Sequence, residues 1–231
     1  MTISQAEVLH DASGAVLAAL KGNIVVIVDV INMSTTLEAA WEAGALGVFG
    51  ASPDQTSAPV FVNPMLIGYS AGCFAKANQS EIILVTEPRV GTTEERVEHA
   101  SLTIKGIEKA GLGGLTILPN LGAETVKMAN FSNKVVIAVT DSGGVAYDAA
   151  FNAGGIVITA TVARTLGKKG LEPMQMGVKR ALTLAQLKKT GISFVAASSN
   201  SLEDVLAANF MMDYIVKIFE KKLSFSLNDT F

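Results

Sequence analysis

Four apolar segments of this sequence each end in a short polar stretch from which a helix is expected to start. These polar stretches span residues 29–36, 86–93, 140–144 and 198–201. Each supplies hydroxyl groups and, at the helix start, backbone amides that have no partner within the helix. Such amides favour a bound anion such as phosphate. In a parallel sheet, ligands bind beyond the carboxyl ends of the strands, so we expect these stretches to form one site.

Three of these stretches also carry a carboxylate at or just after the strand end, namely Asp29, Glu87 and Asp141. Carboxylates beside phosphate-binding amides suit Mg²⁺, which takes oxygen ligands and usually bridges to its substrate. Asp29 is the strongest candidate, because it ends an otherwise apolar strand. Burying an unpaired carboxylate there would cost several kcal/mol.

Other readings of these residues remain open, because Ser, Thr and Asp also start ordinary helices. Residues 35–38 and 201–204 make satisfactory capping boxes that need no further role. His10 and His99 are isolated and indicate neither a histidine triad nor a zinc site. Cys73 has no neighbouring base in the sequence and is expected to be a packed thiol.

The elements that position these residues occur twice in the chain. Residues 23–50 and 133–160 share one pattern, and the two copies align without a gap from the first strand to the end of the helix. An acid faces an acid at Glu38 and Asp148. Each copy predicts a buried strand, an Ala-rich helix closed by glycine, and a second strand. Two strand–helix–strand units imply a parallel sheet covered by helices.

The remaining pattern predicts one α/β domain over residues 1–231, a three-layer α/β/α fold with a mostly parallel sheet and an internal duplication. Further strands are expected at 81–86, 115–118 and 192–197, with a minor one at 60–62. Helices are expected at 12–20, 93–110, 123–131, 174–189 and 201–222. Residues 65–78 are ambiguous, although Gly68 and Gly72 indicate close packing. Residues 224–231 are expected to be a tail or an arm on a partner subunit.

Composition narrows the possible functions. Of 231 residues, 49% are hydrophobic and only 17% are charged, which indicates tight packing or an apolar subunit interface. A net charge of −3 gives no electrostatic footprint for nucleic acid. The single cysteine excludes an intrachain disulfide and fits a reducing compartment. Without a signal peptide or a membrane-length apolar run, we expect a cytoplasmic protein, and the apolar C-terminal helix predicts a homodimer or higher homo-oligomer.

Several of these motifs resemble the 2-phosphosulfolactate phosphatases, the ComB family. Residues 25–36, Val-Val-Ile-Val-Asp-Val-Ile-Asn-Met-Ser-Thr-Thr, and the Glu-Ala-Gly-Ala at 42–45 are similar to the family's first strand, its Asp-Val-Leu-Arg-Ala-Ser-Thr-Thr and its Ala-Gly-Ala helix end. Residues 192–197 and 201–208 resemble its final strand and its Ser-Leu-Glu-Asp-Val-Leu helix start. Residues 140–144 fall where the family has Thr-Thr-Asn-Gly-Thr. The middle of the chain fits poorly.

The resemblance implies a Mg²⁺-dependent acid phosphatase of coenzyme M biosynthesis that acts on a small phosphorylated, sulfonated acid. Three departures put the substrate in doubt. The family's arginine is Asn32 here, which removes a bidentate partner for phosphate or sulfonate. Its Asn-Gly-Thr element is Ser-Gly-Gly at 142–144, and its Gly-Glu-Arg loop survives only as Glu-Pro-Arg at 87–89. The fold is expected to follow the family, whereas the substrate need not.

Two hypotheses follow. In the first, the chain is a divergent phosphatase that uses Mg²⁺ and hydrolyses a small phosphorylated acid. Its candidate catalytic residues are Asp29, Asp141 and Glu203, its metal ligands Asp29 and Glu87, and its phosphate-binding residues Ser34, Thr35, Thr36, Arg89, Gly143, Gly144 and Ser199. In the second, the chain is a catalytically inactive or repurposed relative that binds a small anion or serves as an assembly subunit.

Overall fold

The computed structural model describes residues 5–228, with side chains described as far as Glu220. Within this part the strands are β1 (Ala6–His10), β2 (Ile24–Val28), β3 (Gly47–Ala51), β4 (Ile82–Thr86), β5 (Thr116–Pro119), β6 (Val135–Val139), β7 (Ile156–Ala160) and β8 (Ile192–Ala196). The helices are α1 (Asp11–Leu20), α2 (Met33–Glu42), α3 (Pro64–Ala77), α4 (Thr93–His99), α5 (Ser101–Lys109), the 3₁₀ helix η1 (Gly122–Lys127), α6 (Gly143–Asn152), α7 (Glu172–Lys188) and α8 (Leu202–Asn228).

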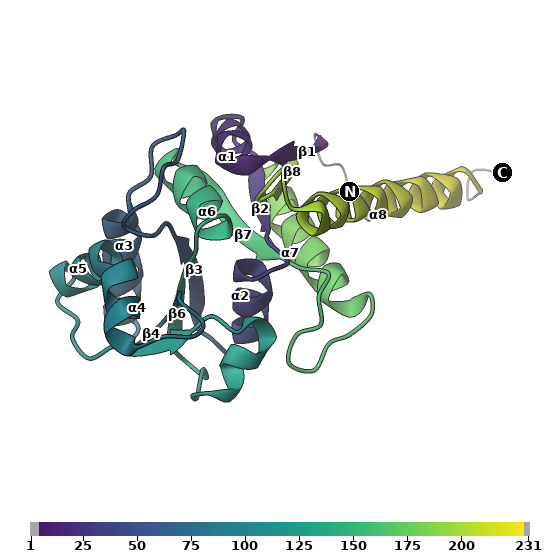
Figure 1. Cartoon of the computed structure of the whole chain (residues 1–231). Coiled ribbons are helices and arrows are strands. Elements are labelled where there is room, and N and C mark those ends of the chain that lie inside the picture. Colours follow the sequence, from purple (N-terminus) through teal and green to yellow (C-terminus); the bar gives the residue numbers. More distant parts are fainter. Residues whose placement is uncertain (1–4, 229–231) are drawn as a thin grey trace.

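The described strands form two parallel sheets of four, flanked by helices (Figure 1). The first sheet has the order β1-β8-β2-β7, and the second has the order β3-β6-β4-β5. This arrangement confirms the predicted α/β class and its three-layer α/β/α form. The sequence pattern predicted one sheet, and the strands instead divide into two.

The two copies of the repeat each cross from one sheet to the other. In the first copy, β2 lies in the first sheet and β3 in the second, and in the second copy β6 and β7 are placed the other way round. The strand pairing is equivalent in both sheets, because Val25 lies opposite Val157 and Val135 lies opposite Gly47. The predicted duplication is therefore present in the backbone, and α2 and α6 are the helices that connect the sheets.

The two central strands of the first sheet, β2 and β8, are buried because helices cover both faces. Ile24, Val26 and Val28 of β2 pack in a core with residues of α7 and α8. Val25 and Ile27, which point to the opposite face, join the core that includes residues of α1, α2 and α6. Burial of all five residues of β2 is the pattern expected for a central parallel strand. The end of β2, where Asp29 follows, is thus fixed from both sides.

The predicted helix at 93–110 is wrong as a single element, because it divides at Ala100 into α4 and α5. The carboxylate of Asp54 accepts hydrogen bonds from the Ser101 hydroxyl and the Leu102 amide, and so caps the start of α5. The cap comes from a residue far away in the sequence. Local helix signals therefore could not reveal the break.

The predicted minor strand at 60–62 is also wrong, since these residues pair with no strand of the described chain. Val60 and Val62 instead pack with Val16 and Val145, side chains of α1 and α6. The following Asn63 caps α3 by accepting a hydrogen bond from the Leu66 amide at 3.1 Å. Residues 60–62 therefore reach α3 as an apolar loop.

Other element boundaries differ from the predicted ones. Strand β1 was not predicted, and it pairs with β8 at the edge of the first sheet. The helix predicted at 123–131 is the shorter η1. Helix α8 is 27 residues long and includes residues 224–228, which the sequence predicted as a tail, while 229–231 lie outside the described residues. None of the described helices is long and apolar enough to cross a membrane.

Helices α3 and α5 pack at unusually close range because glycines lie at their contact. A Cβ atom at Gly68 of α3 would overlap the backbone carbonyl oxygen of Thr103 in α5. One at Gly106 of α5 would overlap the carbonyl oxygen of Met65 in α3. The close packing that the sequence indicated at Gly68 is therefore confirmed, and these helices are held backbone to backbone.

We expect Gly68→Ala to lower the free energy of unfolding by about 1–3 kcal/mol, because a methyl group there forces α3 and α5 apart. Urea denaturation of purified protein measures the change. The matched control is Gly113→Ala, since a Cβ atom at Gly113 meets nothing within 4 Å. An equal loss of stability in both variants would contradict the close packing.

Candidate functional site

Polar loops from both sheets meet at a cavity of about 490 Å³. It is lined by residues that follow β2 (Asp29, Ile31, Asn32), β4 (Glu87, Pro88, Arg89), β5 (Asn120) and β6 (Thr140, Asp141, Ser142). The peptide bonds Ile31–Asn32 and Glu87–Pro88 in this wall are cis. Three of the four polar stretches found in the sequence thus line one cavity at the carboxyl ends of the strands. The fourth, 198–201, does not line it.

Asp29 is the most buried acid of this cavity wall, with 1% of its surface exposed. Its Oδ2 accepts a hydrogen bond from the Gly143 amide at 2.9 Å. Oδ1 has no hydrogen-bond partner among the described residues, although the Met33 amide lies near enough to act on the pKa of Asp29. A Cβ atom at Gly143 would overlap Oδ2, so only glycine permits this approach. One carboxylate oxygen is thus fixed by the Gly143 amide, and the other is buried without a hydrogen-bond partner among the described residues.

The pKa of Asp29 lies well above that of a free aspartate. Burial is the main cause, and the negative charge of Asp204 adds to it; together they raise the pKa of Asp29 to about 7. The amides of Met33 and Gly143 oppose this change only in part. A strongly raised pKa beside a cavity is typical of functional sites.

Asp204 is a second buried acid, close enough to Asp29 to raise its pKa. The sequence did not identify it as a site residue. It lies in the first turn of α8, is 2% exposed, and its Oδ1 accepts a hydrogen bond from the Val30 amide at 2.8 Å. Burial raises the pKa of Asp204 as well. A signal was present in the sequence, because Asp204, Ala208, Met211 and Ile215 share one face of α8, and that face is buried.

Asn120 joins α2 to the loop after β4. It is fully buried, and its Oδ1 accepts a hydrogen bond from the Thr36 hydroxyl at 2.7 Å. Its Nδ2 donates to Glu87 Oε1 at 3.4 Å. No local signal in the sequence showed that Asn120 reaches Glu87.

Arg89 extends from a loop that a second arginine holds in place. Arg96 is buried and donates hydrogen bonds to the carbonyl oxygens of Pro88, Arg89 and Thr92, at 2.9, 3.1 and 3.2 Å. Thr92 also forms a capping box with Glu95 at the start of α4. The exposed Arg89 side chain is therefore carried by a well-fixed backbone at the cavity wall.

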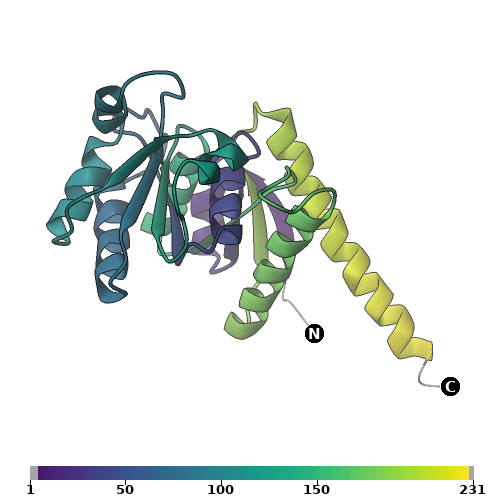
Figure 2. The same cartoon turned by 90° about the horizontal axis from the view of Figure 1, so that it is seen from below.

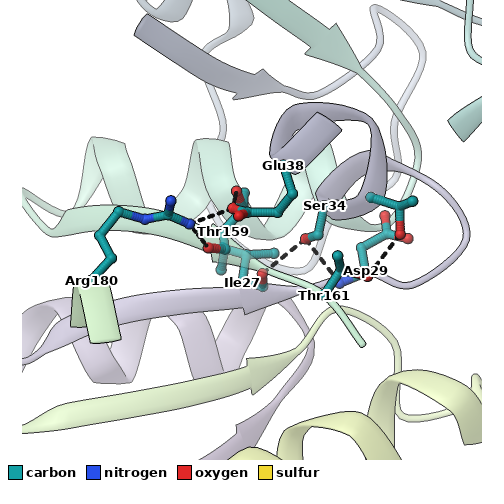
Figure 3. A network of polar contacts seen from close by, with 8 residues as sticks. Ile27, Asp29, Ser34, Glu38, Thr159, Thr161 and Arg180 are labelled. Carbon is teal, nitrogen blue, oxygen red and sulfur yellow. Dashed lines mark hydrogen bonds and ion pairs between the residues drawn. The ribbon is translucent and has the colours of Figure 1, made fainter. Parts of the chain in front are cut away.

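The hydroxyl groups predicted to bind phosphate after β2 already have partners inside the protein. The Ser34 hydroxyl donates to the Ile27 carbonyl at 2.8 Å, as Figure 3 shows. The Thr35 hydroxyl contacts the Val30 carbonyl at 2.7 Å, and the Thr36 hydroxyl donates to Asn120. All three side chains are buried, and none lines the cavity. In this structure they fix the start of α2.

The other predicted site residues do not gather at one place. The Gly144 amide donates to the Thr140 hydroxyl at 2.8 Å. The Ser199 amide donates to the Asp11 carboxylate at 2.7 Å, at the start of α1. Glu203 is exposed on α8 and lines a separate groove. The structure thus brings Asp29, Glu87, Arg89 and Asp141 together, next to Gly143, and leaves Ser199 and Glu203 outside the cavity wall.

The matched acids of the repeat have structural partners. Glu38 accepts a hydrogen bond from the Thr159 hydroxyl at 2.7 Å and forms an ion pair with Arg180 of α7 (Figure 3). Asp148 accepts hydrogen bonds from the amides of Ser52 and Asn63, at 3.1 and 2.8 Å. Each acid therefore ties its helix to a neighbouring strand or loop, away from the cavity.

The charge of the cavity wall is negative, because Glu87 and Asp141 face only one cation, Arg89, and Asp29 adds a further negative charge where it is ionised. An anion would be repelled by this wall unless a cation entered with it. No cluster of three or more His, Cys, Asp or Glu side chains suited to a metal occurs in the described part of the chain. Mg²⁺, however, is often held by one or two carboxylates with several waters. Two carboxylates of this kind, Asp29 and Glu87, line the cavity.

The raised pKa of Asp29 predicts how stability depends on pH. Between about pH 4 and pH 7 the unfolded chain ionises at Asp29 while the folded chain keeps the proton, so the free energy of unfolding falls as pH rises. Asp29→Asn retains an acceptor for Gly143 and cannot ionise. We expect the free energy of unfolding of the variant, relative to that of the unmodified chain, to increase by about 1.4 kcal/mol per pH unit in this window.

Urea denaturation at a series of pH values measures this difference, with the exposed Asp141→Asn as the matched control. A stability difference between Asp29→Asn and the unmodified chain that stays constant from about pH 4 to pH 7 would contradict the burial of an ionisable Asp29.

The sequence matches no protein-family model and no curated protein. The resemblance to the ComB family therefore rests on the motifs of the chain itself and stays a prediction.

Proposed function

We propose that this chain is a divergent, ComB-like phosphatase that hydrolyses a small phosphorylated acid with the help of Mg²⁺. The observation that carries the proposal is the Asp29 carboxylate, buried in the cavity wall with one oxygen bound to Gly143 and the other free. A buried acceptor without a partner is costly to keep, which favours a role in binding. Arg89 in the same wall supplies the positive charge that a phosphate needs.

The position of Arg89 bears on the arginine that the family has and this chain lacks. Asn32 stands in its place and lines the same cavity as Arg89. Arg89 could therefore bind the phosphate from a different loop. The Asn120 amide and the Ser142 hydroxyl lie in the same wall and are able to donate further hydrogen bonds to phosphate oxygens.

In the proposed reaction, water adds to phosphorus while the bond from phosphorus to the ester oxygen breaks, and the products are inorganic phosphate and an alcohol. Asp141, which is exposed at the cavity wall, would accept a proton from the attacking water, and the departing oxygen would take up a proton from solvent to give the alcohol. Asp29 and Glu87 are the residues that would hold Mg²⁺. The bound ion would neutralise charge on the phosphate and offset the excess of carboxylates.

A second candidate function is binding of a small anion without catalysis, or service as an assembly subunit. One observation favours it, because the hydroxyl groups of Ser34, Thr35 and Thr36 and the Gly143 amide all have partners inside the protein. Few donors then remain to surround a phosphate in transfer. For either function we propose a cytoplasmic protein that acts as a homodimer or higher homo-oligomer, and a place in coenzyme M biosynthesis follows only from the resemblance.

Phosphate release from a panel of small phosphate esters, including phosphorylated carboxylic and sulfonic acids, tests the enzyme proposal. We expect turnover that requires Mg²⁺ or Mn²⁺. Asp29→Asn should lower kcat by about 100-fold or more. Arg89→Ala should raise KM by about tenfold or more, because a charged hydrogen-bonding partner is lost. The matched control is Arg164→Ala, which removes an exposed arginine that pairs with Glu124 and does not line the cavity.

Calorimetric titration separates the two candidates. Binding of phosphate with Mg²⁺ but no turnover of any ester would favour the anion-binding function. No binding of Mg²⁺ with or without phosphate, together with no turnover, would contradict both functions at this cavity.

A further inference from the structure

Helix α8 leaves the body of the protein and carries an exposed apolar face. Figures 1 and 2 show it extending outward from the first sheet towards the C-terminus. Its inner face, with Ala208, Met211 and Ile215, is buried against the first sheet. On a neighbouring face, Leu206 is 59% exposed and Phe210 is 43% exposed. Large apolar side chains in this arrangement are normally covered by another surface.

The exposed face borders a groove of about 560 Å³ between α8 and the residues that follow β7. The groove is lined by Val162, Glu203, Leu206, Ala207, Asn209, Phe210 and Asp213. Its apolar centre is formed by Val162, Leu206 and Phe210. A groove of this shape, with one wall formed by a helix, suits a second helix packed alongside.

The charges on this face are arranged about Phe210. In a helix, residues seven apart lie on the same face, so Glu203, Phe210 and Lys217 form one line along α8. Glu203 and Lys217 are exposed, and they stand equally far from Phe210 on opposite sides. A two-fold rotation about an axis that passes through Phe210, perpendicular to α8, therefore brings Glu203 of one helix opposite Lys217 of the other.

We propose that this face of α8 binds a second copy of the chain, with the two α8 helices packed antiparallel about a two-fold axis at Phe210. In such a contact every pair of facing residues occurs twice, once on each side of the two-fold axis. Glu203 would lie opposite Lys217 of the partner subunit, and Leu206 opposite Tyr214 of the partner subunit. Phe210 would pack on Phe210 of the partner subunit.

Self-complementarity identifies the occupant as a second copy and fixes the alignment. A parallel pair would place Glu203 beside Glu203 of the partner subunit and Lys217 beside Lys217 of the partner subunit, and both contacts are repulsive. An antiparallel pair centred on Ala208 would set Glu203 against Asp213 of the partner subunit. The alignment about Phe210 matches opposite charges and joins apolar to apolar side chains. This inference gives a structure to the homo-oligomer proposed above and is independent of the enzymatic proposal.

Charge reversal tests the contact by sedimentation equilibrium of the full-length protein at low salt. We expect a dimer whose dissociation constant rises by about tenfold or more in Lys217→Glu, and likewise in Glu203→Lys, because each change creates like-charge contacts on both sides of the axis. The double variant Glu203→Lys/Lys217→Glu restores opposite charges and should return close to the original dissociation constant. Lys105→Glu on α5, an exposed lysine of the other half of the molecule, is the matched control.

Phe210→Asp should yield a folded monomer, with folding checked by circular dichroism. A chain that is monomeric at concentrations on the order of 100 μM would overturn the proposal. So would single charge reversals that leave the dimer unchanged, a double variant that is no tighter than the singles, or a dimer that survives Phe210→Asp. None of these results depends on activity, so a failed dimer and a failed phosphatase can be told apart.

Discussion

The hydrogen bond from the Gly143 amide to Asp29 Oδ2 is the interaction on which the candidate site depends. It joins the two copies of the repeat, because Asp29 follows the first strand of one copy and Gly143 begins the helix of the other. A side chain at position 143 would overlap the carboxylate, so this contact requires glycine. It also sets which carboxylate oxygen is used inside the protein and which stays free. The position of the cavity thus follows from how the repeats meet.

Burial makes this arrangement costly, since a carboxylate enclosed with one good donor has lost most of its hydration. Asp204 increases the cost, because a second acid is fixed to the Val30 amide immediately after Asp29. Glu87 and Asp141 extend the negative potential along the cavity wall, and Arg89 alone opposes it. A cation would offset this charge, with or without an anion beside it. This is the physical ground for the proposed Mg²⁺-assisted reaction, and it does not depend on any resemblance.

The sequence allowed the duplication, the α/β class and the gathering of three polar loops to be predicted, because each rests on local periodicity and on the topology of parallel strands. Asp29 could also be found, since a carboxylate at the end of an apolar strand is conspicuous. What could not be found depends on distant partners. Asp54 caps α5 from outside the helix, and Asn120 links Thr36 to Glu87 across the chain.

The same dependence on tertiary contacts applies to the hydroxyl groups that were predicted to bind phosphate after β2. The types of Ser34, Thr35 and Thr36 indicated donors at a helix start, yet side-chain direction is decided by tertiary packing. In the folded chain these hydroxyls turn inward to the Ile27 and Val30 carbonyls and to Asn120. A capping pattern at 201–204 likewise does not tell which acid of the first turn of α8 faces the core, and in the structure it is Asp204. Hydroxyls and acids at helix starts are therefore weak evidence for ligands without the fold.

The most direct test of the account is the ionisation of Asp29 itself, followed by the ¹³Cγ chemical shift of aspartate-labelled protein from about pH 4 to about pH 9. We expect a midpoint close to pH 7 for a resonance that Asp29→Asn removes. We also expect Mg²⁺ with phosphate to move this midpoint lower, because a bound cation favours the ionised carboxylate. A midpoint near the value of a free aspartate, unchanged by Mg²⁺ and phosphate, would show a hydrated carboxylate and contradict the site.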